Sequence, residues 1–464
     1  MTSVLLIRPL CEGDEPEFAE PLGIERLAGY LRAHGVPDVE LFDRRLYQAE
    51  RRAVTHRANI PALGFYDDLA QRYPAGNAPD IVGLSLMTAA DTPDASRIIT
   101  RLRHQWPHAT FVAGGVFVNT AAHEAARVLP HHVVLLQGEG ETQLLALARG
   151  TFDPAAPPAP TSPDIWAIPY RPHLERYARL RCAVNMQTSR GCPGSCAFCA
   201  TPLAPPKLRR WTPRSIALVA DEIQECAERL LCAGLPPIFN FVDDDFGPIG
   251  RLEELAGELL RRDLHVAFAC EMRLASLAGQ PQLQERLERL HAAGLTRVFV
   301  GVESLDPNTL ASWRKPSAPL SELPRILAAF RSAGVTLACG YILWHAAQTP
   351  AGAQSEAARL RDLGLFSHRC ALSRLIVFPG CPSAAGQPSV AGFEPMDSAC
   401  EARYQAIAAR MEPLVQPWLQ AAIAEPYEEA RAYLSGDTAE LTAIRAQLDR
   451  INEASYTLFQ EALS

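Results

Sequence analysis

The sequence of 464 residues lacks the features that mark a membrane protein, a secreted protein or a nucleic-acid-binding protein. It contains no run of about 18 apolar residues, the length that crosses a bilayer. The N-terminus has neither a basic start nor a small-residue cleavage site, so its apolar run predicts a β-strand and not a signal peptide. No run of five basic residues occurs and the net charge is −8, whereas nucleic-acid binding needs a concentrated cationic face. We expect a cytoplasmic monomer with no membrane or nucleic-acid partner.

The first 150 residues alternate between strand and helix signals, which predicts a doubly wound parallel-sheet α/β domain. Ligands of such domains lie beyond the carboxyl ends of the strands. The expected strands are Val4–Ile7, Val39–Phe42, Asp80–Leu86, Thr110–Ala113 and Val133–Gln137.

The residues that follow the last three of these strands are candidates for binding a ligand. They are Met87 and Thr88 after the third strand, Gly114 and Gly115 after the fourth, and Gly138 with Glu139 after the fifth. Glycine lets the backbone approach a bulky ligand closely. The alternative is that these glycines only form tight turns between strands and helices.

A Pro-rich linker is expected over residues 151–179, because seven prolines fall within residues 151–172. Residues 180–384 resume the strand–helix rhythm and predict a partial (β/α)6 barrel with its site at the carboxyl ends of the strands. Residues 385–464 lack strand signals and predict a helical C-terminal domain, a candidate for closing the pocket. The six strands expected in the barrel are Ala183–Gln187, Ile238–Val242, Val266–Cys270, Arg297–Val302, Thr336–Ile342 and Leu372–Phe378.

The chain has twelve cysteines, and only Cys192, Cys196 and Cys199 stand close together. In a long chain without a signal peptide, clustered thiols indicate metal ligands rather than disulfides. Three thiolates within eight residues suit an iron–sulfur cluster with one iron left open. Structural zinc is the alternative, but no second cysteine pair follows and the next histidine is His265.

This CxxxCxxC triad, with Phe198 before its last cysteine, resembles the signature of the radical S-adenosylmethionine (SAM) superfamily. The resemblance implies that Cys192, Cys196 and Cys199 hold a 4Fe–4S cluster. It implies that SAM chelates the open iron and yields a 5′-deoxyadenosyl radical, and that Phe198 lies near the adenine.

The segments that end the later strands also resemble this superfamily. By resemblance, Arg273 pairs with the methionine carboxylate of SAM, while Glu303 and Ser304 bind its ribose or ammonium group. The alternative is a salt-bridge network that closes the barrel. Tyr341, Trp344 and His345 follow the fifth strand and are candidates for substrate contact, with core packing as the alternative. Asp243, Asp244 and Asp245 are expected to face solvent in part.

Residues 1–150 resemble the cobalamin-binding domain that precedes the barrel in one radical SAM subclass. The DxHxxG motif, whose histidine ligates cobalt in other cobalamin domains, is absent. Residues near Met87 and Thr88 are therefore expected to pack against the lower face of cobalt. The alternative is a domain retained as a scaffold without cobalamin.

The combined resemblance implies a cobalamin-dependent radical SAM methyltransferase that methylates an unactivated carbon of a small-molecule, natural-product substrate through methylcobalamin. A flavodoxin- or ferredoxin-type protein would supply single electrons. One alternative is a rearrangement, ring contraction or cyclisation with the same cofactors. Another is a non-catalytic protein that binds cobalamin or the cluster.

Overall fold

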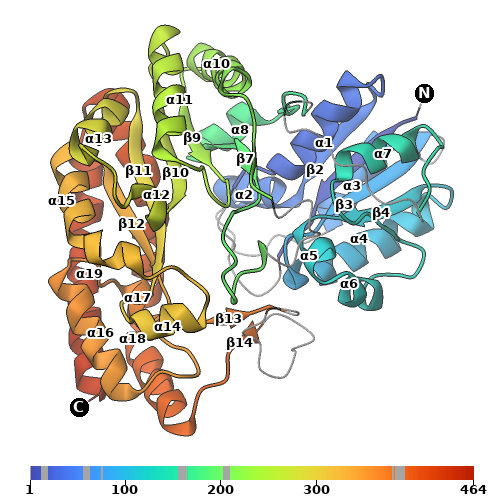
Figure 1. Ribbon diagram of the computed structural model, residues 1–464. Coiled ribbons are helices and arrows are strands. Elements are labelled where there is room, and N and C mark those ends of the chain that lie inside the picture. The colour runs from blue at the N-terminus through green and yellow to red at the C-terminus, as the bar shows by residue number, and fades with distance from the viewer. Residues whose placement is uncertain are drawn as a thin grey trace. The chain divides into compact units, whose positions relative to one another are not determined.

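The computed structural model describes residues 2–11, 19–55, 63–74, 77–154, 164, 166–201, 210–378, 381 and 392–463. The described chain forms two compact units that divide between Tyr177 and Ala178 (Figure 1). Much of the predicted Pro-rich linker, residues 155–163 and 165, lies outside the described residues, as does the predicted boundary at residue 384.

The first unit is built on a five-stranded parallel sheet in the order β2-β1-β3-β4-β5. Its strand order reverses between β1 and β3, so a crevice for ligands is expected where those two strands end. All five predicted strands are confirmed within a few residues. Their bounds are β1 Val4–Arg8, β2 Val39–Asp43, β3 Ile81–Ser85, β4 Thr110–Gly114 and β5 Val134–Leu135.

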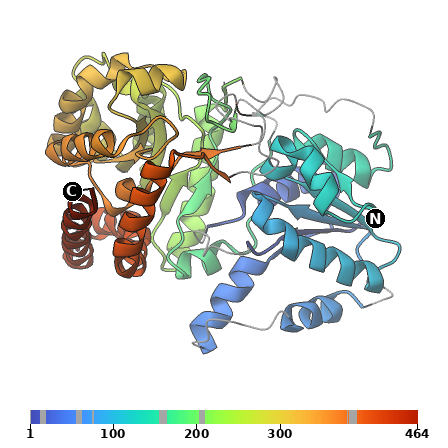
Figure 2. The same ribbon diagram turned by 90° about the horizontal axis from the view of Figure 1, so that it is seen from below.

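Helices cover both faces of this sheet (Figure 2). Alternate residues of β1 serve the two faces: Val4 and Leu6 pack with α1 and α7, while Leu5 and Ile7 pack with α3, α4 and the short helices after β4. The near-continuous apolar runs of these strands follow from this double burial. The helices are α1 Leu22–Ala33, α2 Arg44–Thr55, α3 Leu63–Arg72, α4 Thr92–Gln105, α5 Val116–Thr120, α6 Ala122–Val128 and α7 Gly140–Ala148.

The end of the predicted linker packs against α1. The backbone N–H of Tyr170 donates to the Glu25 carbonyl at 2.9 Å, and the Arg26 guanidinium lies 4.7 Å from the Trp166 ring centroid. A Cβ on Gly29 would lie 2.2 Å from the Ile168 carbonyl oxygen, so glycine is required for this approach. This part of the linker is therefore an ordered layer of the first unit.

The second unit contains a five-stranded parallel sheet in the order β12-β11-β10-β9-β6. Each strand lies beside its predecessor in sequence, as in a partial (β/α) barrel, so all carboxyl ends lie at one edge. The strands are β6 Val184–Met186, β9 Ile238–Phe241, β10 Ala267–Arg273, β11 Leu295–Glu303 and β12 Thr336–Tyr341. The helices that follow them are α10 Ile216–Cys232, α11 Ile249–Arg261, α12 Leu274–Leu277, α13 Leu283–Ala292, α14 Pro307–Ser312, α15 Leu323–Ala333 and α16 Pro350–Asp362.

The predicted sixth strand, Leu372–Phe378, differs from the structure. Its start belongs to α17 (His368–Leu372), and Arg374 forms a single parallel bridge with Trp344. The chain then forms β13 (Ile376–Val377), which pairs antiparallel with β14 (Gly392–Phe393). A pairing partner from later in the chain thus takes this segment out of the parallel sheet. The remaining short elements are β7 Ser189–Arg190, β8 Thr212–Pro213 and α8 Leu174–Arg179.

The C-terminal region consists of α18 (Ser398–Ser435) and α19 (Ala439–Leu463), which lie side by side (Figure 1). Near the start of α18, the Cys400 thiol donates to the Gln348 carbonyl, in the loop after β12. Near its end, α18 packs against the first residues of β9 and β10. The helix thus runs from the carboxyl edge of the sheet to its amino edge, so only its first turns lie near the predicted pocket. No helix among the described residues has the length and apolar character to cross a membrane.

Ion pairs hold the end of α18 against the sheet. Arg297, near the start of β11, contacts Glu425 at 2.9 Å and Glu429 at 2.8 Å. Glu429 also accepts hydrogen bonds from Thr336 of β12 and from Arg445 of α19. Arg297, Glu425 and Glu429 are largely buried, so each depends on the others for the interactions that it has given up with water.

We expect Glu429→Gln to lower the free energy of unfolding by about 2 kcal/mol, because it leaves Arg297 buried with one carboxylate fewer. Glu425 remains as a partner, which limits the loss. Urea denaturation would measure it, with Glu453→Gln as the control. Glu453 pairs with Arg361 at 2.9 Å in an exposed position, where such pairs contribute less than about 1 kcal/mol. Equal losses in the two variants would contradict the prediction.

Candidate functional site

The three clustered cysteines lie in the loop that leaves β6 at the carboxyl edge of the second sheet. All three are partly buried free thiols. The backbone N–H of Gly194 donates to Cys192 Sγ at 3.4 Å, and that of Thr201 donates to Cys199 Sγ at 3.4 Å. Hydrogen bonds to sulfur favour the thiolate form, which is the form that ligates metals.

Gly194 keeps the space between two of the sulfur atoms open. A Cβ at this position would lie 3.3 Å from Cys192 Sγ and 3.9 Å from Cys196 Sγ. No group of three His, Cys, Asp or Glu side chains within the described ranges converges on a single metal ion. A 4Fe–4S cluster makes a different demand, because each thiolate binds a different iron atom. The thiol donors and the open space between them fit such a cluster with one iron left unligated by the protein.

Charged side chains surround the loop and act on its thiols. Burial raises the pKa of Cys192, with Asp245 adding to the rise and Arg273 opposing it. Burial likewise raises the pKa of Cys196, and Lys315 opposes this rise. Two cations are thus placed where they favour thiolate formation, and sequence reasoning identified only Arg273.

Two residues far away in sequence contact the end of the loop. The Trp313 carbonyl accepts from the Ala197 N–H at 2.8 Å, and the Trp313 ring meets Phe198 edge to face at 5.4 Å. Cys381 Sγ lies 3.4 Å from the Cys199 carbonyl oxygen and 3.5 Å from that of Phe198. Neither Trp313 nor Cys381 was predicted, because only the folded chain brings them to the loop.

Arg273 ends β10 and pairs with a buried acid. Its Nε donates to Asp245 Oδ2 at 2.7 Å, with the Arg273 side chain 37% exposed and that of Asp245 1% exposed. This salt bridge agrees with the alternative considered for Arg273. The Arg273 side chain is nevertheless partly exposed at the carboxyl edge of the sheet, where it can also contact a ligand. The expectation that Asp243, Asp244 and Asp245 partly face solvent is wrong for the first and third, which are buried.

Glu303 occupies a strained position at the end of β11. Its φ of 68° lies in the left-handed region that non-glycine residues rarely adopt, and strain of this kind clusters at functional sites. A Cβ on Gly301 would lie 2.1 Å from Glu303 Oε1, so that glycine makes room for the carboxylate. Lys315 Nζ lies 3.5 Å from the same oxygen. Burial raises the pKa of Glu303 and Lys315 lowers it.

Ser304 and Tyr341 are directed into the interior. Ser304 Oγ lies 3.2 Å from Glu356 Oε1, and the Tyr341 hydroxyl donates to Glu356 Oε2 at 2.7 Å. The Tyr341 oxygen also accepts from the Leu305 N–H at 2.9 Å. Burial raises the pKa of Tyr341. Their contacts fix the turn after β11, which is a structural task, and Glu356 was not predicted to take part in it.

Trp344 is fully buried, and its indole N–H donates to the Ala371 carbonyl at 2.8 Å. Its ring packs against Tyr404 and Phe459 of the C-terminal helices, in line with the core-packing alternative. His345 is buried with its ring edge on Trp313, at 5.0 Å. Burial lowers the pKa of His345 to about 4.

In the first unit, the loops after β1 and β3 meet at the point where the strand order reverses. Cys11 Sγ lies 4.0 Å from Thr88 Oγ1. Asp91 accepts from the N–H groups of Met87 and Thr88 at 2.7 and 2.9 Å and pairs with Arg45 at 2.9 Å. Met87 is 49% exposed, so its apolar side chain is available at this edge.

The glycines predicted at this edge have different local roles. Gly115 has a φ of 104°, and a Cβ there would lie 2.4 Å from the Leu86 carbonyl oxygen, so the tight turn alone explains it. Gly138 is bracketed by Asn119, whose Oδ1 accepts from its N–H at 2.6 Å. Gly114 has ordinary contacts, and Glu139 is buried just before α7. The exposed side chain of Met87, next to turns that contain glycine, fits a flat, largely apolar ligand such as a corrin.

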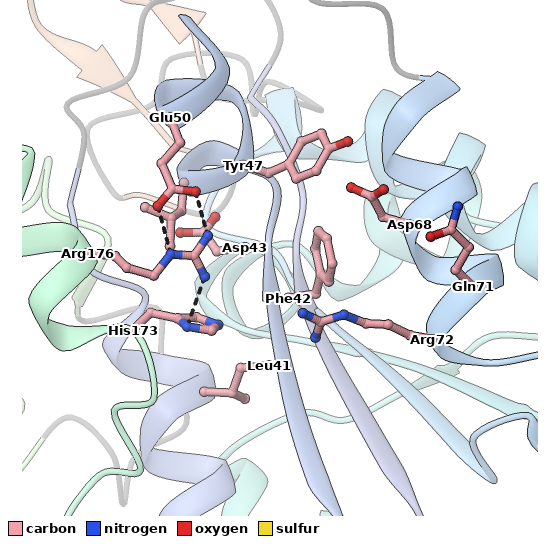
Figure 3. A pocket seen from close by; sticks show the side chains of 11 residues that line it. Leu41, Phe42, Asp43, Tyr47, Glu50, Asp68, Gln71, Arg72, His173 and Arg176 are labelled. Atoms are coloured by element: carbon pink, nitrogen blue, oxygen red, sulfur yellow. Dashed lines mark hydrogen bonds and ion pairs between the residues drawn. The ribbon is translucent and has the colours of Figure 1, made fainter. Parts of the chain in front are cut away.

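A separate pocket of about 430 Å³ lies at edge strand β2, between α2, α3 and the end of the linker (Figure 3). None of the predicted site residues lines it. Arg176 donates to Glu50 at 2.7 Å and contacts His173 at 3.1 Å, and Arg72 pairs with Glu40 at 3.3 Å. Arg176 and Arg72 thus already have carboxylate partners within the protein.

Comparison with known families places both units. The family model of the radical SAM superfamily matches residues 186–345, and that of the B12 binding domain matches residues 16–148. The chain therefore combines a radical SAM domain with a B12 binding domain, the pair that the resemblance to cobalamin-dependent radical SAM enzymes predicted. The matches imply a 4Fe–4S cluster and SAM in the second unit and cobalamin in the first.

Among characterised proteins, the chain is 31% identical over 170 residues to the bacteriochlorophyllide d C-12(1)-methyltransferase of Chlorobaculum tepidum, covering 36% of this chain and 34% of that protein. It is 29% identical over 172 residues to the hopanoid C-2 methylase of Rhodopseudomonas palustris, covering 36% and 31%. The hopanoid C-3 methylase of Methylococcus capsulatus is 27% identical over 354 residues, covering 70% and 61%. The chain thus spans about a third of the first two relatives and under two thirds of the third.

Solved structures share the fold at low identity. The cobalamin-dependent SAM radical enzyme OxsB, with aqua-cobalamin and SAM bound, superposes with a TM-score of 0.72 at 15% identity, covering 100% of this chain and 80% of that one. The radical SAM methyltransferase TsrM from Kitasatospora setae, with tryptophan substrate and a SAM analogue bound, gives 0.63 at 20% identity, covering 82% and 75%. These matches confirm the predicted fold class of both units and the helical C-terminal region.

We expect Gly194→Ala to weaken cluster binding. The new methyl group would crowd the sulfur atoms of Cys192 and Cys196, and these atoms could not move away from it while they are bound to iron. Loss of iron to a chelator should be about tenfold faster, the lower end of the effect typical of groups that support metal ligands. Gly250→Ala is the matched control, since a Cβ there meets nothing within 4 Å. Unchanged iron retention in Gly194→Ala would refute the prediction.

The buried His345 should make the folded protein less stable in acid. The unfolded chain takes up a proton near pH 6.5, which folded His345 accepts only near pH 4, so stability falls as the pH drops through this interval. Replacement by Phe should remove about 2 kcal/mol of the stability difference between about pH 7 and about pH 5. Urea denaturation at both values would measure it. An equally steep dependence in the variant would contradict the assignment.

Proposed function

We propose that this chain is a cobalamin-dependent radical SAM C-methyltransferase that methylates an unactivated carbon of a small-molecule substrate. The observation that carries the proposal is the cysteine loop, with three partly buried thiols and Gly194 beside two of them, in a chain that also has a B12 binding domain. The three curated relatives are named as methylases or methyltransferases. Their names are the reason for proposing methyl transfer over a rearrangement.

The cofactors supply the chemistry that amino-acid side chains lack: the cluster can deliver one electron to SAM, and cobalamin can carry a methyl group. In the second unit, Cys192, Cys196 and Cys199 would hold the cluster and leave one iron for SAM. The charged side chains near the cysteine loop suit the methionine part of SAM, which carries both a carboxylate and an ammonium group. Arg273 and Lys315 can pair with its carboxylate, and Glu303 can accept from its ammonium group.

The aromatic residues of the loop suit the adenine part of SAM. Phe198 is held by the Trp313 ring, so its orientation is fixed before a ligand arrives. The hydrogen bonds among Ser304, Tyr341 and Glu356 would act indirectly, because they hold the turn that follows Glu303 in place. We propose His345 as a neutral, buried wall of the site and not as a proton donor, since its pKa lies well below 7.

In the first unit, we propose that cobalamin binds where β1 and β3 end. Met87 and Thr88 would lie against its lower face, and Gly114, Gly115, Gly138 and Glu139 would line the neighbouring turns. The structure offers one addition to these residues: Cys11 approaches Thr88 from the end of β1. Asp91 fixes the backbone of Met87 and Thr88 and would keep this surface in place.

The partners that complete the proposal are a one-electron donor of flavodoxin or ferredoxin type and a small natural product. A reducing cytoplasm suits the twelve free cysteines of the described chain. We further propose that the protein acts as a monomer and needs neither nucleic acid nor a membrane.

The first test reconstitutes the cluster anaerobically, adds hydroxocobalamin and measures iron, cobalamin and 5′-deoxyadenosine after reduction with SAM. We expect near-stoichiometric cobalamin and deoxyadenosine formation that Cys199→Ala abolishes. Cys232→Ala is the control, since it removes an exposed thiol from α10. Labelled methyl transfer from SAM to a substrate would then establish the reaction.

The outcomes separate the possible reactions. A folded protein that carries the cluster but no cobalamin would overturn the proposal. Deoxyadenosine and substrate turnover without label in the product would indicate a rearrangement with the same cofactors. No deoxyadenosine from a fully loaded protein would indicate a binding protein without this activity.

A further inference from the structure

The cysteine loop begins with two residues whose polar groups are all buried. Thr188 and Ser189 come shortly after β6, with Gln187 between, and neither is exposed to solvent. Their backbone and side-chain donors therefore need partners inside the protein. Cys192 stands only three residues beyond Ser189, so whatever holds this pair also sets the direction in which the loop departs.

Asp243 supplies the partners for these donors. Its carboxylate accepts from the N–H and hydroxyl of Thr188, both at 2.8 Å. It also accepts from the N–H of Ser189 at 2.5 Å and from its hydroxyl at 3.1 Å. Asp243 comes just after β9, the strand next to β6, and is only 1% exposed. One carboxylate thus binds the first two residues of the loop through four hydrogen bonds.

A second buried group holds Thr188 from the opposite side. Arg251 of α11 donates to Thr188 Oγ1 at 2.9 Å and to its carbonyl oxygen at 3.0 Å. It also donates to the Arg214 carbonyl at 2.9 Å, and its guanidinium lies 4.8 Å from the Phe246 ring centroid. The Thr188 hydroxyl therefore accepts from Arg251 while it donates to Asp243.

The same network extends to the residue before the pair. Arg214 donates to the Gln187 carbonyl at 2.8 Å and pairs with Glu222 at 2.7 Å. Four buried charged side chains thus surround three consecutive residues at the root of the loop. Removing charges from water is unfavourable, and apolar residues of similar size could close a barrel without that penalty. Hydrogen bonds, unlike apolar contacts, fix direction as well as position.

We infer that Asp243 and Arg251 are positioning residues for the iron–sulfur cluster, acting through Thr188 on the path of the cysteine loop. This inference rests on the proposed function for the presence of the cluster and adds the residues that set its geometry. Groups that orient metal ligands commonly change metal affinity 10- to 100-fold when they are replaced. The network should therefore affect the cluster itself and not only the stability of the fold.

The test compares variants at Thr188, which is smaller and less disruptive to replace than a buried charge. Thr188→Val keeps the shape of the side chain but loses the hydroxyl that joins Asp243 to Arg251, and Thr188→Ser restores it. Asp243→Asn is the direct variant, because it removes the buried charge and replaces one accepting oxygen, such as the one that accepts from the Thr188 hydroxyl, with an NH2 group. After anaerobic reconstitution, each protein would be examined by electron paramagnetic resonance of the reduced cluster, by iron loss to a chelator and by thermal unfolding.

We expect Thr188→Val and Asp243→Asn to show altered g values and about tenfold faster iron loss, and Thr188→Ser to match the parent protein. Glu429→Gln serves as the control for stability, since it disrupts a buried ion pair at the opposite edge of the sheet. It should unfold at a lower temperature with unchanged cluster signals.

The inference is overturned if Thr188→Val unfolds earlier but keeps the parent g values and iron-loss rate, as expected of Glu429→Gln. Should Asp243→Asn fail to fold, the pair Thr188→Val and Thr188→Ser decides the matter. Failure of the proposed function has a different signature, namely a parent protein that binds no cluster at all.

Discussion

The parallel direction of the strands is the constraint on which both sites depend. In a parallel sheet every strand ends at the same edge, so the loops that carry the chemistry gather there. Those loops have left the hydrogen-bond ladder of the sheet, and their N–H groups need other acceptors. In both units, buried carboxylates accept hydrogen bonds from these N–H groups, and the residues of the candidate sites lie in the loops that are held in this way.

The two units arrive at related solutions from unrelated segments. In the first, Asp94 accepts from the Leu10 N–H at 2.8 Å and pairs with Arg44 at 2.9 Å, while Asp91 holds Met87 and Thr88. In the second, Asp243 holds the start of the cysteine loop. In each case a buried carboxylate beyond the end of a strand accepts from N–H groups of a loop at the carboxyl edge. The loops are therefore held in place before any cofactor binds, which reduces the ordering that binding requires.

The sequence was sufficient for most of the strands, the fold class and the cysteine triad, because their signals are local. Apolar runs of strand length give the sheet, and three thiols within eight residues give the loop. Cys381, Trp313 and Lys315 left no such signal, because they reach the loop only through tertiary structure. The prediction of the sixth strand was wrong for a similar reason. Part of that segment pairs with β14, which lies later in the chain, beyond a segment with no strand pattern.

The three adjacent acids did carry a readable signal that was missed. From Phe241 to Asp245, past the end of β9, buried residues alternate with exposed ones, so Asp243 and Asp245 point inward and Asp244 points outward. Charge suggested exposure, but the period of two predicted burial for alternate members. For the site residues carried over from the family, the structure shows which are accessible, such as Met87, and which are buried, such as Ser304.

The long path of α18 has a consequence for how the protein is made. Arg297 of β11 and Thr336 of β12 find their carboxylate partners only in residues 425–429, and Arg445 of α19 completes the group. During synthesis these strands emerge well before their partners, whereas the first unit has all of its strands by Leu135. Domains fold in the order in which they leave the ribosome. The first unit can therefore begin to fold while the chain is still growing, whereas the second gains these particular contacts only after Arg445 of α19 has emerged.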